Sequence, residues 1–312
     1  RCHPYLLPEM QAAQNPDQKQ GLVDFDKALF GHIGFTIRNG FRALWLGMTG
    51  SHFATVNVDT APEMKRYYQQ LTRFSAAFAF LADISMGTLG GALKRKEKLS
   101  ARLGDILSLM YLASAALKRF EDEGRQAADA PLLHWVIWDC MFKAQNAFEG
   151  VIANFPNRLF ATLLRRIVVF PLGRPYFVPS DQLGHEVATL LINPSATRDR
   201  LTSDVYLPTD VEEPVGALEA ALHATIEAEP VEAKVRRAIK SGQFKPGLLV
   251  GGGVDALYDV AVAAGIISRD EHALITRRGE LRDKVIRVDD FPFDFGLRQA
   301  LDGQADEARK AA

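Results

Sequence analysis

A chain of 312 residues is long enough for one large domain or two ordinary ones, each with a buried core. The composition is 47% hydrophobic and 24% charged, with a formal net charge of −1, and it excludes both a disordered chain and a generally basic nucleic-acid-binding protein. Cys2 and Cys140 lie far apart in the sequence, which excludes a disulfide framework and a paired-cysteine zinc site and favours a reducing, cytoplasmic compartment.

Residues 22–48 carry apolar side chains at intervals of three and four, which predicts one amphipathic helix, or two that meet near Gly31 or Gly34. The apolar positions are Phe25, Leu29, Ile33, Ile37, Phe41, Leu44 and Met48. Further along, the run Thr60-Ala61-Pro62-Glu63 predicts a helix start, with the threonine as cap, the proline in the first turn and the glutamate completing a capping box.

Residues 74–120 form the segment around which the rest of the chain is expected to pack. Two apolar runs are joined by a basic cluster, and each run contains a single charged residue, Asp83 in the first and Asp105 in the second. This pattern predicts a helical hairpin whose first arm ends at Gly90-Gly91. The second arm carries an apolar stripe at helical spacing that consists of Leu99, Leu103, Ile106, Met110, Ala113 and Leu117.

The first arm, residues 74–93, is about as long as a bilayer span, and basic residues follow it. Asp83, two serines, a threonine and three glycines lower its hydropathy, and such a mixture is common in the cores of helical bundles. We therefore expect a buried helix here and no transmembrane segment.

A further helical pattern covers residues 130–154 and ends at Phe155-Pro156-Asn157. Four helix-sized segments joined by short loops, without strand-like alternation, are typical of an antiparallel bundle. The sequence therefore predicts an all-α fold, with an antiparallel helical bundle over residues 1–155 followed by a smaller helical lobe.

Residues 156–205 are predicted to be a basic, proline-rich connector with short helices. Within it, residues 158–170 are strongly apolar and basic, and two interpretations fit them. In the more common arrangement, a short helix packs across the bundle. In the other, apolar side chains enter a membrane or a partner while arginines face phosphates. The residues assigned to that contact are Arg158, Phe160, Leu163, Arg165, Arg166, Ile167 and Phe170.

Residues 206–300 are predicted to form the smaller lobe. Between residues 201 and 233 the chain is rich in Asp and Glu and contains no Lys or Arg, and this acidic belt faces either solvent or the basic cluster of the hairpin. A disordered tail is expected at residues 301–312. Helices are expected near residues 215–228, 231–241, 255–264 and 270–278.

The sequence contains no local catalytic or metal-binding motif. The seven histidines form no HExxH sequence and no short cluster with cysteine or carboxylate, so no metal ligand is assigned. The run Gly251-Gly252-Gly253-Val254-Asp255-Ala256 matches a GxGxxA dinucleotide loop in form only, because two short helical patterns follow it in place of a βαβ unit. A flexible loop before a helix is the simpler interpretation.

Arg102 and Asp105 lie three residues apart on the second arm of the hairpin. We expect them to form a buried polar clamp inside the bundle, with Asp83 of the first arm in the same layer. Such a group is structural, since an isolated Arg and Asp pair specifies no reaction.

Long blocks of the chain are similar to a known family. They are RCHPYLLPEM, HIGFTIRNGFRALWLGMTG, RYYQQLTRFSAAFAFLADISMGTLGGALKRKEKLSARLGDILSLMYLASAALKRFEDEGR, PLLHWVIWD, NFPNRL, FPLGRPYFVPSDQLGHEVA, PSATRDRL and VDDF. From residue 1 to about residue 291, the chain resembles the C-terminal extension of the bacterial long acyl-CoA dehydrogenases of fatty-acid β-oxidation. It is similar, more weakly, to the extra C-terminal helical domain of the mitochondrial very-long-chain enzyme. The region around GGGVD fits the pattern least.

The resemblance implies an FAD enzyme that converts an acyl-CoA to a trans-2-enoyl-CoA and passes electrons to an electron-transfer flavoprotein. In that family a glutamate removes the α proton and the flavin accepts the β hydride. The glutamate belongs to an EGxN-type segment that is expected just upstream of residue 1, together with the segments that bind FAD and acyl-CoA. No residue of this chain matches them, so no catalytic or cofactor-binding residue is assigned, and the fragment alone is expected to be inactive.

Two roles are therefore open for this part of the enzyme. One is a non-catalytic domain that supports the catalytic domains, completes a homodimer, or contacts the inner membrane peripherally from the cytoplasm. The other is an independent helical module that binds an acyl chain or a membrane surface. A groove beside the hairpin would favour the second role.

Overall fold

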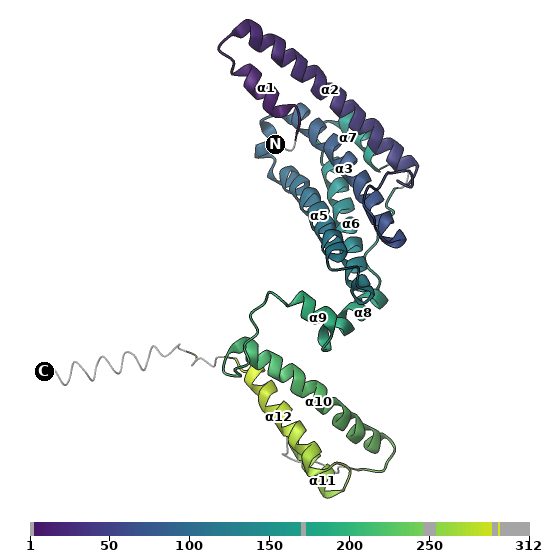
Figure 1. The fold of residues 1–312 in the computed structure, drawn as a ribbon, viewed down its shortest axis with the longest axis vertical. Helices are drawn as coiled ribbons and strands as arrows, with labels where there is room; N and C mark the ends of the chain where they lie inside the picture. The colour runs from purple at the N-terminus through teal and green to yellow at the C-terminus, as the bar shows by residue number, and fades with distance from the viewer. Residues whose placement is uncertain (1–2, 170–172, 246–253, 289–292, 294–312) are drawn as a thin grey trace, which may run out of the picture. The chain divides into compact units, whose positions relative to one another are not determined.

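The computed structural model describes residues 3–169, 173–245, 254–288 and 293, and every regular element in these ranges is a helix (Figure 1). The all-α prediction is therefore confirmed. The chain divides into two compact units, Arg1–Leu191 and Ile192–Ala312. Phe170, the triple glycine at residues 251–253 and the tail at residues 301–312 lie outside the described residues.

The first unit is a bundle of long helices. In its described part they are α2 (Gln18–Met48), α3 (Pro62–Leu89), α5 (Glu97–Asp122) and α6 (Ala130–Ala153). The shorter helical elements are α1 (Leu6–Ala13), α4 (Ala92–Arg95), the 3₁₀ turn Ala127–Asp129, α7 (Arg158–Leu164), the π-helical turn η2 (Arg165–Val169) and α8 (Asp181–Ile192). α2 packs along α1 and α3, whereas α5 packs along α6 and α3.

The predicted hairpin forms from α3 and α5. α3 ends at Leu89, and Gly90 follows with a φ of +49°, a left-handed conformation that glycine adopts without strain. The hairpin and the apolar stripe of its second arm are both confirmed. The stripe residues that are buried, or partly buried against the same core, are Leu99, Leu103, Ile106, Met110, Ala113 and Leu117.

α3 begins differently from the prediction. Its N-cap residue is Ala61, whose side chain accepts no hydrogen bond, and Pro62 occupies the first turn as expected. The hydroxyl of Thr60 instead donates to Glu121 Oε1 at the far end of α5. The predicted capping box is therefore wrong, because a tertiary partner takes the threonine that would have capped the helix.

None of the helices in the described ranges combines the length and the hydropathy that a membrane crossing requires. The apolar side chains of α3 are used in the bundle core, where Phe74, Ala77 and Leu81 are buried. Both observations agree with the expectation that residues 74–93 form a buried helix.

The second unit has a small core of its own. Its described helices are α9 (Ala196–Leu201), α10 (Pro214–Lys240), α11 (Val254–Ala263) and α12 (Arg269–Ile286). α10 and α11 both pack against α12. The buried residues of this core include Ala228, Val231, Val235, Ala261 and Ile275.

α10 is a single helix where the sequence predicts two, at residues 215–228 and 231–241. Pro230 lies between the predicted segments, and proline disfavours a helix interior because it lacks the N–H group. In the structure Pro230 lies inside α10 and is exposed, while Ala228 and Val231 on either side are buried in one core. The shared burial holds both halves in one helix despite the proline.

Part of the acidic belt is paired within its own unit. Arg198 of α9 donates to both carboxylate oxygens of Glu219 on α10, at 2.7 and 2.5 Å. Arg278 of α12 donates to Glu232 of the same helix α10. Basic residues from outside the belt therefore neutralise it locally, which the composition of residues 201–233 alone does not reveal.

Candidate functional site

The segment at residues 158–169 forms α7 and η2, and its two sides differ. The side that packs on the bundle consists of buried or partly buried Phe160, Leu164, Ile167 and Val168. The other side exposes Arg158, Leu163, Arg165 and Arg166. The segment therefore packs across the bundle and also presents arginines and an apolar side chain outward.

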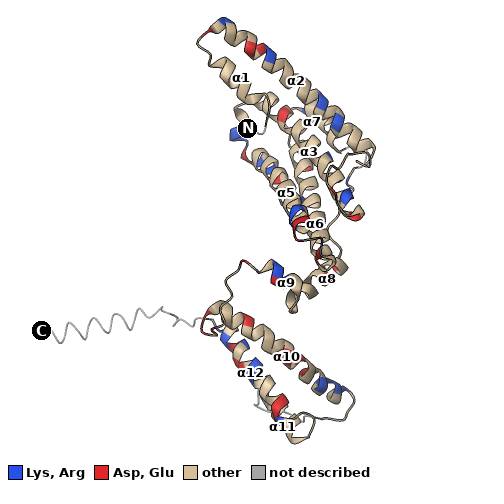
Figure 2. Ribbon diagram, in the orientation of Figure 1, with Lys and Arg blue, Asp and Glu red and all other residues tan. Residues whose placement is uncertain are grey.

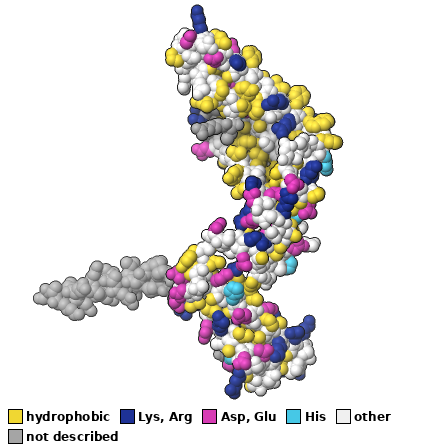
Figure 3. All heavy atoms as spheres, in the orientation of Figure 1, with side chains coloured by type: hydrophobic (Ala, Val, Ile, Leu, Met, Phe, Trp, Pro, Cys, Tyr) yellow, Lys and Arg dark blue, Asp and Glu magenta, His cyan; other side chains and the backbone are white. Residues whose placement is uncertain are grey.

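α2 presents large apolar side chains to solvent along one side. Phe41 and Trp45 are 71% and 58% exposed. We call this side the α2 face. It consists of Phe30, Ile33, Ile37, Phe41, Trp45 and Met48. Figure 3 shows hydrophobic side chains gathered over α2, in the orientation of Figure 1, with basic side chains among them.

The buried side of α2 consists mostly of small residues, among them Ala28, Gly40 and Ala43. A Cβ atom added at Gly40 would lie 2.9 Å from Cε2 of Phe80 on α3, so the two helices approach closely there. An apolar stripe at helical spacing is typical of the side that faces a core. In α2 much of the predicted stripe is exposed instead, because small residues, which carry little hydrophobic signal, make the contact with α3.

An apolar groove lies between α2, α3 and the segment at residues 158–169. Its volume is about 280 Å³. The side chains that line it are apolar apart from Thr36, and they include Leu163 and Ile167 of the predicted contact segment. The other lining residues are Ile37, Gly40, Phe41, Leu44, Phe80 and Ile84.

The chain around the α2 face is basic. Residues 27–58 and residues 158–169 contain no Asp or Glu. Arg38 and Arg42 are exposed on α2. Figure 2 shows acidic residues near the start of α2 and basic residues further along it. The exposed part of α2 after residue 27 thus carries the aromatic side chains of the α2 face together with arginines, and it contains no carboxylate.

The three residues of the predicted polar clamp have different surroundings. Arg102 lies over Gly150 of α6, where an added Cβ would be 2.8 Å from Arg102 Nε. Asp105 is exposed. Asp83 is buried, and the contacts recorded for it are with α2 and the segment before α1. The expected clamp therefore does not form among the described residues, since Arg102 lies against α6, Asp105 faces solvent and Asp83 contacts α2 and the segment before α1.

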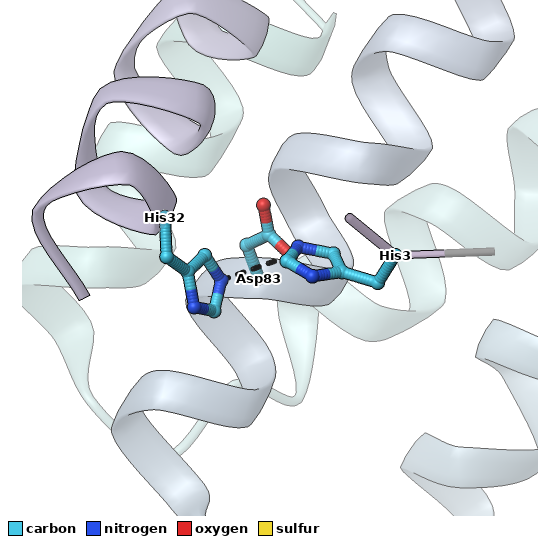
Figure 4. Close-up of side chains that lie close together, drawn as sticks. All are labelled: His3, His32 and Asp83. Carbon is cyan, nitrogen blue, oxygen red and sulfur yellow. Dashed lines mark ion pairs between the residues drawn. The ribbon is translucent and has the colours of Figure 1, made fainter. Parts of the chain in front are cut away.

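Asp83 meets two histidines that come from separate segments of the chain (Figure 4). Its Oδ1 atom lies 3.3 Å from Nε2 of His3, which precedes α1, and 3.8 Å from Nε2 of His32 on α2. One ligand-type atom from each of the three residues lies within 4.8 Å of the other two. Sequence reasoning missed this cluster because no short spacing joins its members.

The cluster is held by further polar contacts. The hydroxyl of Thr36 donates to Asp83 Oδ2 at 3.0 Å. His32 Nδ1 lies 2.8 Å from Glu9 Oε1, and since an ionised carboxylate only accepts, this nitrogen carries the hydrogen. His3 Nδ1 accepts hydrogen bonds from the backbone N–H groups of Tyr5 and Leu6, at 3.3 and 3.2 Å.

A buried cation lies elsewhere in the first unit. Arg73 of α3 is 7% exposed and donates to the Val168 carbonyl oxygen at 3.4 Å. Burial lowers the pKa of Arg73 below its usual value, and burial also raises the pKa of the neighbouring Tyr176 phenol. The Gln145 amide donates to the Tyr176 carbonyl at 3.0 Å and accepts from the Tyr176 N–H at 3.2 Å. These bonds attach η2 to α3, and Tyr176 to α6.

The comparisons with known proteins agree with the resemblance seen in the sequence. No solved structure matches the chain. A family model described as acyl-CoA dehydrogenase, C-terminal, bacterial type, matches residues 1–291, which include every helix described above. The chain therefore belongs to the family of bacterial-type acyl-CoA dehydrogenase C-terminal domains.

Proposed function

We propose that this chain is the non-catalytic C-terminal part of an FAD-dependent acyl-CoA dehydrogenase of fatty-acid β-oxidation. The parent enzyme would oxidise acyl-CoA to trans-2-enoyl-CoA and pass electrons to an electron-transfer flavoprotein. Membership of the family over residues 1–291 supports this assignment. In the enzyme, the α2 face and the exposed side of α7 attach the protein peripherally to an anionic membrane, on the cytoplasmic side of the inner membrane.

The observation that carries the membrane role is the pairing of exposed aromatic residues with arginines along α2, where residues 27–58 contain no carboxylate. A helix of this kind lies in the plane of a membrane with its apolar side among the acyl chains. Burying one large apolar side chain contributes about 1.5–3 kcal/mol, and each arginine near an anionic surface adds about 1 kcal/mol. A few residues of the α2 face are therefore enough for reversible attachment.

Attachment to a membrane suits the substrate of such an enzyme. Long acyl chains enter the bilayer because each buried CH₂ group contributes about 0.8 kcal/mol. An enzyme held at the surface meets this substrate where it is concentrated. The proposal therefore gives the C-terminal domain a role in locating the enzyme and leaves the oxidation to other segments.

We place the FAD and the catalytic glutamate outside this chain. A flavin site needs donors for the pyrophosphate and for the polar edge of the ring. The groove between α2 and α3 offers Thr36 as the one polar side chain among its described lining residues, so it does not fit a flavin.

A second candidate role is supported by that same groove. Its apolar lining and volume of about 280 Å³ suit a segment of an acyl chain. In this alternative the domain is an independent module that binds the acyl chain itself, and the α2 face is one wall of the site.

The membrane role is tested on the full-length enzyme by co-sedimentation with vesicles of phosphatidylcholine, with and without phosphatidylglycerol. The variants Phe41→Ser and Trp45→Ser should each lower the partition coefficient about tenfold or more, because each removes a side chain that enters the membrane. Arg42→Gln should weaken binding only to the anionic vesicles. Tyr111→Ser is the matched control, since Tyr111 is 72% exposed on α5, away from the α2 face, and it should change nothing.

Unchanged vesicle binding in Phe41→Ser and Trp45→Ser would reject the membrane role. Titration with palmitoyl-CoA then tests the acyl-chain module, with Leu163→Trp as the variant that fills the groove. A heat of binding that disappears in Leu163→Trp supports the module, and the absence of heat in the native protein rejects it. Light scattering of the same variants reports whether the α2 face joins two copies in a homodimer.

A further inference from the structure

Three side chains that can ligate a metal converge where the segment before α1 meets α2 and α3 (Figure 4). We propose that His3, His32 and Asp83 bind a divalent transition-metal ion, with Zn²⁺ as the best match. The ion would join three segments of the first unit that are far apart in the sequence.

The spacing of the ligand atoms suits a tetrahedral ion. Zn²⁺ binds histidine nitrogen and carboxylate oxygen at about 2.0–2.2 Å, which places neighbouring ligand atoms about 3.4 Å apart. Asp83 Oδ1 lies 3.3 Å from His3 Nε2 and 3.8 Å from His32 Nε2. One ligand atom from each of the three residues lies within 4.8 Å of the other two, so modest side-chain rotations bring the two histidines onto one ion.

The contacts outside the cluster orient two of the ligands correctly. Glu9 accepts the Nδ1 hydrogen of His32 at 2.8 Å, and this leaves the lone pair of His32 Nε2 directed at the cluster. The Thr36 hydroxyl donates a hydrogen bond to Asp83 Oδ2 at 3.0 Å, which leaves the other carboxylate oxygen, Oδ1, to bind the ion. A histidine that donates its other nitrogen to a carboxylate is the usual arrangement at protein metal sites, because it fixes the ring and raises its basicity.

The cluster also contains one buried polar atom without a hydrogen-bond partner among the described residues. The Asp83 side chain is 3% exposed, and its Oδ1 lies 3.8 Å from His32 Nε2, which carries no hydrogen in the neutral ring because His32 Nδ1 donates to Glu9. Nε2 of His3 is buried and has no hydrogen-bond partner among the described residues. A divalent cation would bind Asp83 Oδ1 and His32 Nε2 directly, and His3 Nε2 once that nitrogen has lost its hydrogen.

Binding at His3 requires a proton to move. Its Nδ1 accepts from two backbone N–H groups, so the hydrogen of the neutral ring is on Nε2. When Nε2 binds the ion, this hydrogen leaves and Nδ1 takes one from solvent, and the two hydrogen bonds to the start of α1 are lost. Metal binding is therefore coupled to the N-terminus of α1, and its affinity should fall in acid as protons compete for the histidines.

The donor set determines the class of ion. Two imidazole nitrogens and one carboxylate oxygen favour Zn²⁺ and its neighbours over Mg²⁺ and Ca²⁺, which prefer all-oxygen sites. Three protein ligands leave a fourth tetrahedral position for water or another ligand.

The test uses the full chain in a Cys2→Ser background, because a thiol next to His3 would bind the same ions. Co²⁺ is added and its visible absorption is followed, then Zn²⁺ is titrated in competition and calorimetry gives the stoichiometry. One ion per chain, displaced by Zn²⁺ and not by Mg²⁺, is the expected result. Zn²⁺ should also raise the melting temperature of the first unit.

Three variants and one control define the site. His32→Gln and Asp83→Asn should abolish stoichiometric binding, and Glu9→Gln should weaken it about 10–100-fold through the orientation of His32. His272→Gln is the matched control, because His272 Nε2 lies 3.0 Å from Asp259 in a pair that no third ligand joins among the described residues, and it should leave binding unchanged.

Two results would overturn the site. One is the absence of stoichiometric binding, and of any rise in melting temperature, in the native chain. The other is binding that persists in His32→Gln and Asp83→Asn. If either of these variants fails to fold, the metal affinity of Glu9→Gln decides the test. Weaker binding in Glu9→Gln supports the site, and an unchanged affinity counts against it.

Discussion

Gly216 shows how a single residue sets a packing distance in the second unit. It lies in the first turn of α10, beneath the loop that leads into the helix. A Cβ atom at this position would lie 2.1 Å from the carbonyl oxygen of Asp210 and 2.9 Å from that of Pro208. Both neighbours are backbone atoms, so a side chain here is accommodated only if the loop or the helix moves.

We therefore expect Gly216→Ala to lower the free energy of unfolding of the second unit by about 1–3 kcal/mol. Gly279→Ala is the matched control within α12, where an added Cβ meets no atom within 4 Å. That change should raise the free energy of unfolding by about 0.5–1 kcal/mol, because alanine favours a helix interior. Urea unfolding, monitored by circular dichroism, measures the free energy of unfolding of each variant. Equal effects of the two substitutions would refute the steric argument.

The burial of Asp83 could be predicted from the sequence, whereas its partners could not. Asp83 is the lone carboxylate of an apolar run with the composition of a bundle-core helix, and it is buried, whereas Asp105, the lone carboxylate of the second run, is exposed. The neighbours of Asp83, which are His3, His32 and Thr36, come from other segments, and no periodicity links them to α3. The same limit applies to Arg102 and Asp105, whose spacing on one helix gave no information about which neighbour each side chain meets.

At the scale of elements, serine side chains cap the starts of two helices, and such caps are a local signal. Ser180 Oγ accepts from the Leu183 N–H at 3.2 Å, and Ser195 Oγ accepts from the Arg198 N–H at 3.1 Å, as expected for caps. The cap at Thr60 and the break near Pro230 were wrong, because a tertiary partner and a shared core outweigh local preference at these two places. Periodicity also identified α2 as a helix but not the side that packs, since small residues form that contact.

The pair that joins α9 to α10 makes the stability of the second unit depend on pH. Hydrogen bonds from Arg198 hold the pKa of Glu219 below its usual value of 4.5. A carboxylate whose pKa is lower in the folded state stabilises the fold above the unfolded pKa and loses this contribution as pH falls through the folded pKa. The stabilisation should therefore be complete near neutral pH and be lost below about pH 4.5.

Melting temperatures of the second unit, measured from about pH 6 down to about pH 3, test this link. The native chain should become less stable as the pH falls, and Glu219→Gln should reduce the slope because the variant side chain does not titrate. Arg198→Met should reduce it similarly by removing the donor. A slope that is the same in all three proteins would show that other carboxylates control the acid response.

At the scale of the whole molecule, the described part of the chain forms two hydrophobic cores with no residue in common. The buried residues of the first lie between Ala43 and Tyr176, and those of the second lie between Ala228 and Ile275. This division follows the two compact units, Arg1–Leu191 and Ile192–Ala312. A protein with two separate cores is expected to unfold in two steps, because each core can lose its packing without disrupting the other.

Differential scanning calorimetry of the full chain should resolve two transitions, and one core substitution in each unit assigns them. Ile106 is fully buried, so Ile106→Ala should cost about 2–5 kcal/mol and lower only the transition of the first unit. Val235 is 2% exposed, and Val235→Ala should cost about 2 kcal/mol and lower only the other transition. If either substitution shifts both transitions together, the two cores unfold as one cooperative unit. If each substitution lowers only its own transition, the second unit folds independently of the first.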